Sequence, residues 1–335
     1  MIATLLDSFV FACPAEPTDD DVVSLIRSLL EWRDLERTEL TRMFVSAQAA
    51  DCLARAGGGF PPWQLIRSAI VRLELEFAPH DVFSLIQALM DRLPKIEEEV
   101  GVNEVLLEGA TCTPAIHARR NEVFKAEFER LLALVCLFTE RHNLAGEHVP
   151  VVLTRELNVC PTRVNFAASL EDTDPRLGRL PRQLANPVLV FDHSAEYIDN
   201  VDPVEVWSAA ASQATLAAAI RLYTQRVAQQ SGVEYSQEWN IGASFVQTIV
   251  SLRLQRRALG RSVLRACAET ILNQNLAATH ALRVSAAANS AQLRRRQDSA
   301  WRRDIDHEFH LHYWTTSEGP ELAAVVQHND FSIPG

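Results

Sequence analysis

Residues 294–314 read Arg-Arg-Arg-Gln-Asp-Ser-Ala-Trp-Arg-Arg-Asp-Ile-Asp-His-Glu-Phe-His-Leu-His-Tyr-Trp. These 21 residues contain five arginines, three histidines, four acids and four large aromatic side chains. After Asp304 the apolar residues recur at a period of two, which places Phe309, Leu311 and Tyr313 on one face of an extended chain. We therefore expect the chain to change from helix to strand here and to form a C-terminal β-hairpin over about 307–333.

Upstream of this stretch the pattern is helical. We expect helices at about 204–229, 241–258 and 261–292, so that the helical region extends nearly to residue 303. Residues 253–303 hold eleven arginines against two acids, a local charge of +9. Arg261 and Arg265 fall outside the apolar side of the last expected helix, which predicts an exposed arginine face.

The first half of the chain differs in its charge and in its expected secondary structure. Residues 1–110 contain 19 acids and 9 bases, a local charge of −10. Thr18 followed by Asp21 is typical of a helix start, and further helices are expected at 33–56, from Pro62 and at about 81–93. A strong helical pattern at 117–142 precedes short β-rich segments at 149–153, 164–167 and 187–191.

Together these patterns predict an α+β protein that is predominantly α-helical. It would have a helical N-terminal bundle, a short-stranded middle segment, a long helical region and a C-terminal β-hairpin. We expect two domains, an acidic helical domain over 1–110 and an α+β domain over 111–335. The second would contain the basic helical region at about 253–303 and the hairpin.

Composition excludes several classes of protein. The basic residues are 30 arginines and two lysines, and neither Lys95 nor Lys125 follows a glycine, so nucleotide binding of the P-loop type is excluded. The Gly-x-Ser-x-Gly elbow and the Gly-x-Gly-x-x-Gly fingerprint are also missing. No apolar stretch approaches the roughly 20 residues that a membrane helix needs, which predicts a cytoplasmic protein without membrane association.

The charge asymmetry leads to the first functional hypothesis, a non-catalytic cytoplasmic subunit of a multi-protein or nucleic-acid-associated assembly. Arginine forks match phosphate oxygens and tryptophans stack on unpaired bases. The partner is left open between another protein, self-association, DNA and RNA. The residues expected to bind it are Arg294, Arg295, Arg296, Trp301 and Arg303.

An alternative hypothesis is a metal-dependent hydrolase or nuclease. His310 and His312 lie two apart on one strand face, and His328 would arrive from the returning strand with Glu308 beside them. Imidazoles and a carboxylate suit zinc, iron or manganese. A divalent metal is therefore the cofactor that this alternative requires.

A second alternative is a metal-independent, toxin-like ribonuclease. Arg302 and His307 are five residues apart, a spacing that would let an arginine hold a phosphodiester while a histidine transfers a proton. With Glu308 they form the candidate catalytic set. The sequence does not decide between an enzyme and a binding protein.

Overall fold

The computed structural model describes residues 3–38, 40–56, 61–116, 120–144, 149–157, 159–171, 181–210, 212–235, 238–285 and 290–334, without the side chain of Arg257. Its secondary structure is mixed, 45% helical and 24% strand. The chain divides into two compact units. The first comprises Ile2–Arg37 and Thr41–Asn200, and the second consists mainly of Val201–Gly335. Each unit is built on one mixed β-sheet.

The sheet of the first unit has the strand order β2-β1-β4-β6-β5-β3. Strands β2, β1, β4 and β6 run parallel, whereas β5 and β3 are antiparallel to their neighbours. The carboxyl ends of the four parallel strands therefore lie along one edge. The strands are β1 (Ala3–Leu6), β2 (Arg42–Val45), β3 (Leu107–Thr113), β4 (Val151–Leu153), β5 (Thr162–Leu170) and β6 (Arg182–Phe191).

The first unit buries one central helix, α6 (Glu122–Arg141), against this sheet. Phe128, Leu131 and Val135 of α6 are almost completely buried, and they share a hydrophobic core with Leu5 of β1 and Val190 of β6. The remaining helical elements are η1 (Ser8–Phe11), α1 (Asp19–Arg37), α2 (Ala49–Arg55), α3 (Trp63–Arg72), α4 (Pro79–Arg92), α5 (Ile96–Val100) and α7 (Ser194–Asn200). The predicted helix at 117–142 is thus confirmed in its central part.

Two elements of the N-terminal half differ from the expected helical bundle. Strand β1 was not expected, and β2 lies inside the helix predicted over 33–56. Apart from Arg42, both strands are buried, and buried parallel strands are apolar runs without the alternation that identifies a half-exposed strand. Residue 110, the expected domain boundary, lies within β3, and the first compact unit extends to Asn200.

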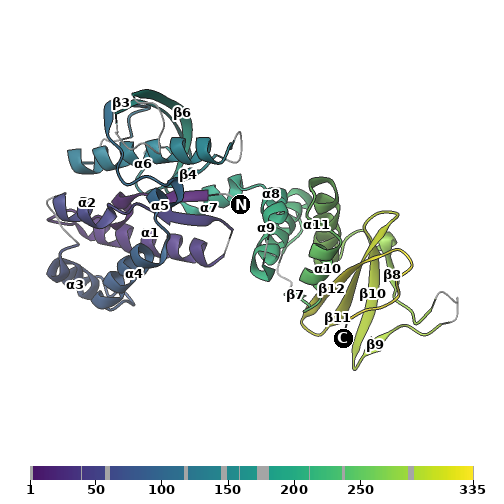
Figure 1. Cartoon of the computed structure of the whole chain (residues 1–335). Helices are drawn as coiled ribbons and strands as arrows, with labels where there is room; N and C mark the ends of the chain where they lie inside the picture. Colours follow the sequence, from purple (N-terminus) through teal and green to yellow (C-terminus); the bar gives the residue numbers. More distant parts are fainter. Residues whose placement is uncertain are drawn as a thin grey trace. The chain divides into compact units, whose positions relative to one another are not determined.

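The second unit combines helices with a sheet of order β7-β12-β11-β10-β8, and β9 pairs with β10 (Figure 1). Helix α10 packs on β12, and α11 packs on α9 and α8. Its helices are α8 (Pro203–Ala209), α9 (Gln213–Ser231), α10 (Phe245–Ser251), α11 (Arg257–Ile271) and η4 (Leu276–Ala278). Its strands are β7 (Asn240–Ile241), β8 (Thr279–Ala281), β9 (Arg294–Arg295), β10 (Asp298–Asp304), β11 (Phe309–Thr316) and β12 (Gly319–Gln327).

The predicted hairpin is present, since β11 and β12 pair from Phe309 opposite Gln327 to Thr316 opposite Gly319. The helix predicted over 261–292 is too long, because α11 ends at Ile271 and three further strands follow. Asn273 and Asn275 adopt positive φ angles of 53° and 46°, which a helix does not allow. Within the described ranges, no helix is long and apolar enough to cross a membrane.

Candidate functional site

Three of the second unit's histidines, His280, His310 and His312, lie on one face of its sheet. Arg302 of β10 pairs with His312 of β11 and with His280 of β8, and Asp304 pairs with His310. Directly paired residues of adjacent antiparallel strands project to the same side. This face therefore gathers three imidazoles, a guanidinium and a carboxylate.

The segment after β12 lies against this face and covers His310 and His312, whereas His280 stays exposed. His310 is 2% exposed and His312 is completely buried. Nδ1 of His312 lies 2.7 Å from the carbonyl oxygen of Ser332, and the indole nitrogen of Trp314 donates to the carbonyl of Pro334 at 2.8 Å. Because a carbonyl only accepts, His312 carries its proton on Nδ1. Burial lowers the pKa of His312 to about 4, so the ring is neutral near pH 7.

Next to His312, the carboxylate of Asp304 and the imidazoles of His310 and His328 form a continuous series of polar contacts. Nδ1 of His310 lies 2.9 Å from Oδ1 of Asp304, and Nε2 of His310 lies 2.8 Å from Nδ1 of His328. Burial lowers the pKa of His310, although the carboxylate of Asp304 acts in the opposite direction. His310 is therefore neutral near pH 7, with its proton favoured on the nitrogen that faces Asp304.

This series of polar side chains ends with His328 at a surface groove of about 930 Å³. His328, His307 and Glu308 line this groove, and the backbone nitrogen of His328 donates to the carbonyl of Glu308 at 2.8 Å. Thr248 and Ser251, at the carboxyl end of α10, form part of its wall. The structure thus brings together two candidate catalytic residues, His307 and Glu308, with one candidate metal ligand, His328.

The structure places the candidate metal ligands in different surroundings. His310 and His328 meet, but His312 is bonded to Ser332 and Glu308 lies in the groove. In the described part of the chain, no three His, Cys, Asp or Glu side chains are grouped so that they could hold a metal ion. His310, His312 and His328 each take part in a hydrogen bond.

Two arginines of the predicted binding face, Arg303 and Arg295, form ion pairs within the second unit. Arg303 is 1% exposed, bonds Oε2 of Glu269 at 3.0 Å and donates to the backbone carbonyls of Gln274 and Asn275, just after α11. It therefore stabilises the end of that helix. Arg295 bonds Asp298 and Glu321 and lies over the ring of Trp314.

The other candidate binding residues are accessible to different degrees. Arg294 and Arg296 are exposed at the turn between β9 and β10, whereas Trp301 and Arg302 are half-buried in β10. A second group of exposed arginines surrounds the start of α11. Its members are Arg253, Arg256, Arg261 and Arg265.

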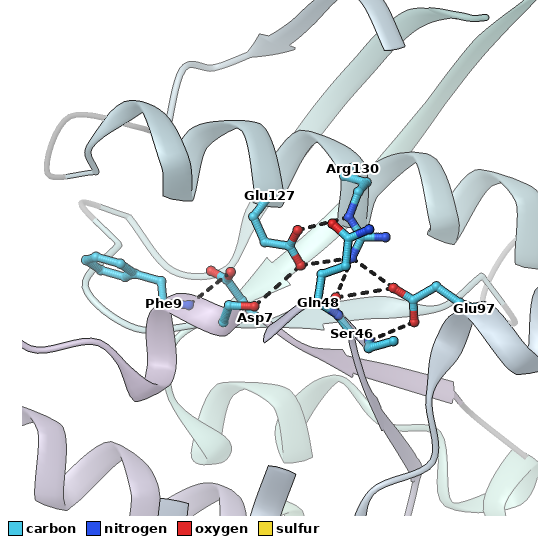
Figure 2. Close-up of polar contacts among 9 residues, drawn as sticks. Asp7, Phe9, Ser46, Gln48, Glu97, Glu127 and Arg130 are labelled. Atoms are coloured by element: carbon cyan, nitrogen blue, oxygen red, sulfur yellow. Dashed lines mark hydrogen bonds and ion pairs between the residues drawn. The ribbon is translucent and has the colours of Figure 1, made fainter. Parts of the chain in front are cut away.

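The first unit contains a polar cluster that the sequence analysis missed (Figure 2). Arg130 of α6 bonds Glu127 through Nε at 2.9 Å and Nη2 at 3.0 Å, and Nη2 lies 2.8 Å from Oε1 of Glu97. Glu97 also accepts from the hydroxyl of Ser46 at 3.2 Å and from the backbone nitrogen of Ala47 at 2.9 Å. Burial opposes the charge of Arg130, but its carboxylate partners raise the pKa of the guanidinium overall.

A neighbouring group continues the cluster along the carboxyl edge of the parallel strands. Asp7 follows β1 and accepts from the hydroxyl of Thr154, which follows β4, at 2.7 Å. The Arg120 guanidinium lies 2.6 Å from the Asp7 carboxylate and donates to Thr154 at 2.7 Å. Arg155 donates to the carbonyl of Phe9 within η1 and to that of Ala12 directly after it.

Strand ends at this edge of an α/β sheet commonly carry binding residues. Here, however, the carboxylates of Asp7, Glu97 and Glu127 are all bonded to other residues of the unit. We therefore infer that the cluster has a structural role, which is to hold β1, β2 and β4 against α5 and α6. A polar residue directly after a short apolar run, as Asp7 follows 3–6, is the sequence signal that would have indicated it.

Comparisons with protein-family models, with curated proteins and with solved structures find no match for this chain.

Proposed function

We propose that this protein is a cytoplasmic, nucleic-acid-binding subunit that contacts phosphates through the exposed arginines of its second unit. The observation that supports the proposal is the charge of the helical part of this unit. Residues 213–271 contain seven arginines and three acids. A surface with unbalanced arginines attracts polyanions, and arginine forks fit phosphate oxygens.

The contacts of Glu269 strengthen this argument. Glu269 lies one helical turn from Arg265 on α11, where the two side chains would ordinarily form an ion pair. Its carboxylate instead bonds the buried Arg303. Arg261 and Arg265 are one turn apart and exposed, so both are accessible to a phosphate backbone.

The turn between β9 and β10 offers a second set of contacts through Arg294 and Arg296, both exposed. Arg295 between them is held by Asp298 and Glu321, which keeps the turn in place. Trp301 and Arg303 are left out of the proposed contact surface, since the first is half-buried and the second supports α11.

The test is fluorescence anisotropy with labelled single-stranded RNA and duplex DNA at several salt concentrations. We expect affinity to fall steeply with salt, with a slope of roughly −0.7 to −0.9 per phosphate contact. Charge reversal of Arg253, Arg261 and Arg265 to glutamate should weaken binding at least about tenfold and flatten the slope. Charge reversal of Arg294 and Arg296 tests the second set.

Matched controls come from the first unit, where Arg27 of α1 and Arg67 of α3 are also exposed. Reversing these two charges changes the net charge of the protein in the same direction but leaves the proposed surface intact. Equal loss of binding in control and test variants, or no binding by the unaltered protein at low salt, would refute the proposal.

A further inference from the structure

The groove beside the second unit's sheet contains two accessible imidazoles. His328 and His307 both line it and both are exposed. Charged groups around them are Glu308 and Asp330 in the groove wall and Arg302 and Asp304 on the adjoining strand β10. Two histidines in one groove supply the acid and the base that a proton-transfer reaction requires.

The two histidines differ in how they are held. His328 is bonded through Nδ1 to Nε2 of His310, whose other nitrogen faces Asp304. With the proton of His310 on the side of Asp304, His328 must donate its own Nδ1 proton to His310. Nε2 of His328 then keeps its lone pair and acts as the proton acceptor. This is the orienting arrangement of a carboxylate–histidine pair, extended by one imidazole.

The groove adjoins the proposed phosphate-binding surface. Ser251 and Leu252 line it, and the exposed Arg253 and Arg256 follow in the same turn of the chain. A strand bound by these arginines would pass the mouth of the groove. Phosphodiesters are therefore the substrate class that the surroundings of the groove favour.

We infer that this groove cleaves RNA without a metal ion, an inference that rests on the proposed nucleic-acid binding. Nε2 of His328 takes the proton of a ribose 2′-hydroxyl, and the 2′-oxygen forms a bond to the adjacent phosphorus. The bond from phosphorus to the 5′-oxygen breaks, and protonated His307 donates its proton to that oxygen. The products are a 2′,3′-cyclic phosphate and a 5′-hydroxyl, and no other reactant is consumed.

His310 and Asp304 are positioning residues in this scheme. They hold the ring of His328 and fix its tautomer, and they do not touch the substrate. Replacing Asp304 by asparagine removes the negative charge that orients His310. We expect the rate to fall and the acidic limb of the pH–rate profile to move to lower pH, which a merely structural role would not produce.

The experiment uses the full chain, EDTA, and fluorophore–quencher oligonucleotides of one sequence as RNA and as DNA. We expect cleavage of RNA only, with cyclic-phosphate ends. His328→Ala and His307→Ala should each lower the rate at least about 100-fold, the range of general acid–base catalysis. Binding of the DNA oligonucleotide should stay within about twofold in both variants.

The control is His80→Ala, which removes an exposed imidazole from α4 of the first unit and should leave the rate unchanged. It is purified in parallel, so a contaminating nuclease would appear equally in all samples. Binding without RNA cleavage overturns this inference and leaves the proposed function standing. Cleavage of DNA, or equal rates in all variants, also overturns it, and absence of binding overturns both.

Discussion

Replacing Arg130 by methionine should destabilise the first unit by about 3–5 kcal/mol, the usual effect of breaking a buried ion pair. The side chains of Arg130, Glu127 and Glu97 are 8%, 6% and 6% exposed. Without the guanidinium, Glu127 loses two bonds of 2.9 and 3.0 Å, and Glu97 loses one contact of 2.8 Å. Two carboxylates would then be buried with too few donors, and burying an unpaired charge is the dominant energetic effect.

Urea unfolding, followed by circular dichroism, measures the free energy of unfolding. Hydrogen exchange of peptides from β1 and α6 shows whether the loss of stability lies in the first unit. The matched control is Arg72→Met, because Arg72 pairs with Asp19 while their side chains are 59% and 38% exposed. Because both side chains are exposed to solvent, that pair should contribute little to the free energy of unfolding. Combining Glu97→Gln and Glu127→Gln with Arg130→Met removes the two buried, unpaired negative charges. The triple variant should therefore recover part of the lost free energy of unfolding. Equal effects of Arg130→Met and Arg72→Met would refute this account of the cluster.

Two further predictions concern the second unit. Because the pKa of His312 is lowered to about 4, the unfolded chain binds a proton that the folded chain excludes between about pH 6.5 and 4. The free energy of unfolding should therefore fall as the pH drops through this window, by up to about 3 kcal/mol, and urea unfolding of His312→Gln should lack this part of the pH dependence. In Gly260→Ala the new Cβ would lie 2.6 Å from Cδ1 of the fully buried Trp207. Overpacking should cost about 1–3 kcal/mol and alter the near-UV circular dichroism, whereas helix propensity alone predicts a gain of about 1 kcal/mol, so a stabilised variant would contradict the packing.

Much of the local structure was predictable because it depends on neighbours in the sequence. The cap at the start of α1 is present, with the backbone nitrogen of Thr18 donating to Asp21 at 2.8 Å and that of Asp21 donating to the Thr18 hydroxyl at 3.2 Å. Helix α6 and the hairpin of β11 and β12 also follow from their hydrophobic periods. The buried strands β1 and β2 were missed, since a strand covered on both faces has no alternation to recognise.

The same distinction between local sequence pattern and tertiary contacts applies to the candidate site. The sequence by itself determined that residues 294–314 concentrate arginines and histidines and that strand alternation after Asp304 puts His310 and His312 on one face. Only the tertiary structure decided which of them are accessible: Arg303 is buried beneath the end of α11, His312 is covered by Ser332, and His328 reaches both His310 and the groove. Burial and hydrogen-bond partners come from segments 18 to 34 residues away in the chain, and periodicity carries no information about contacts at that separation.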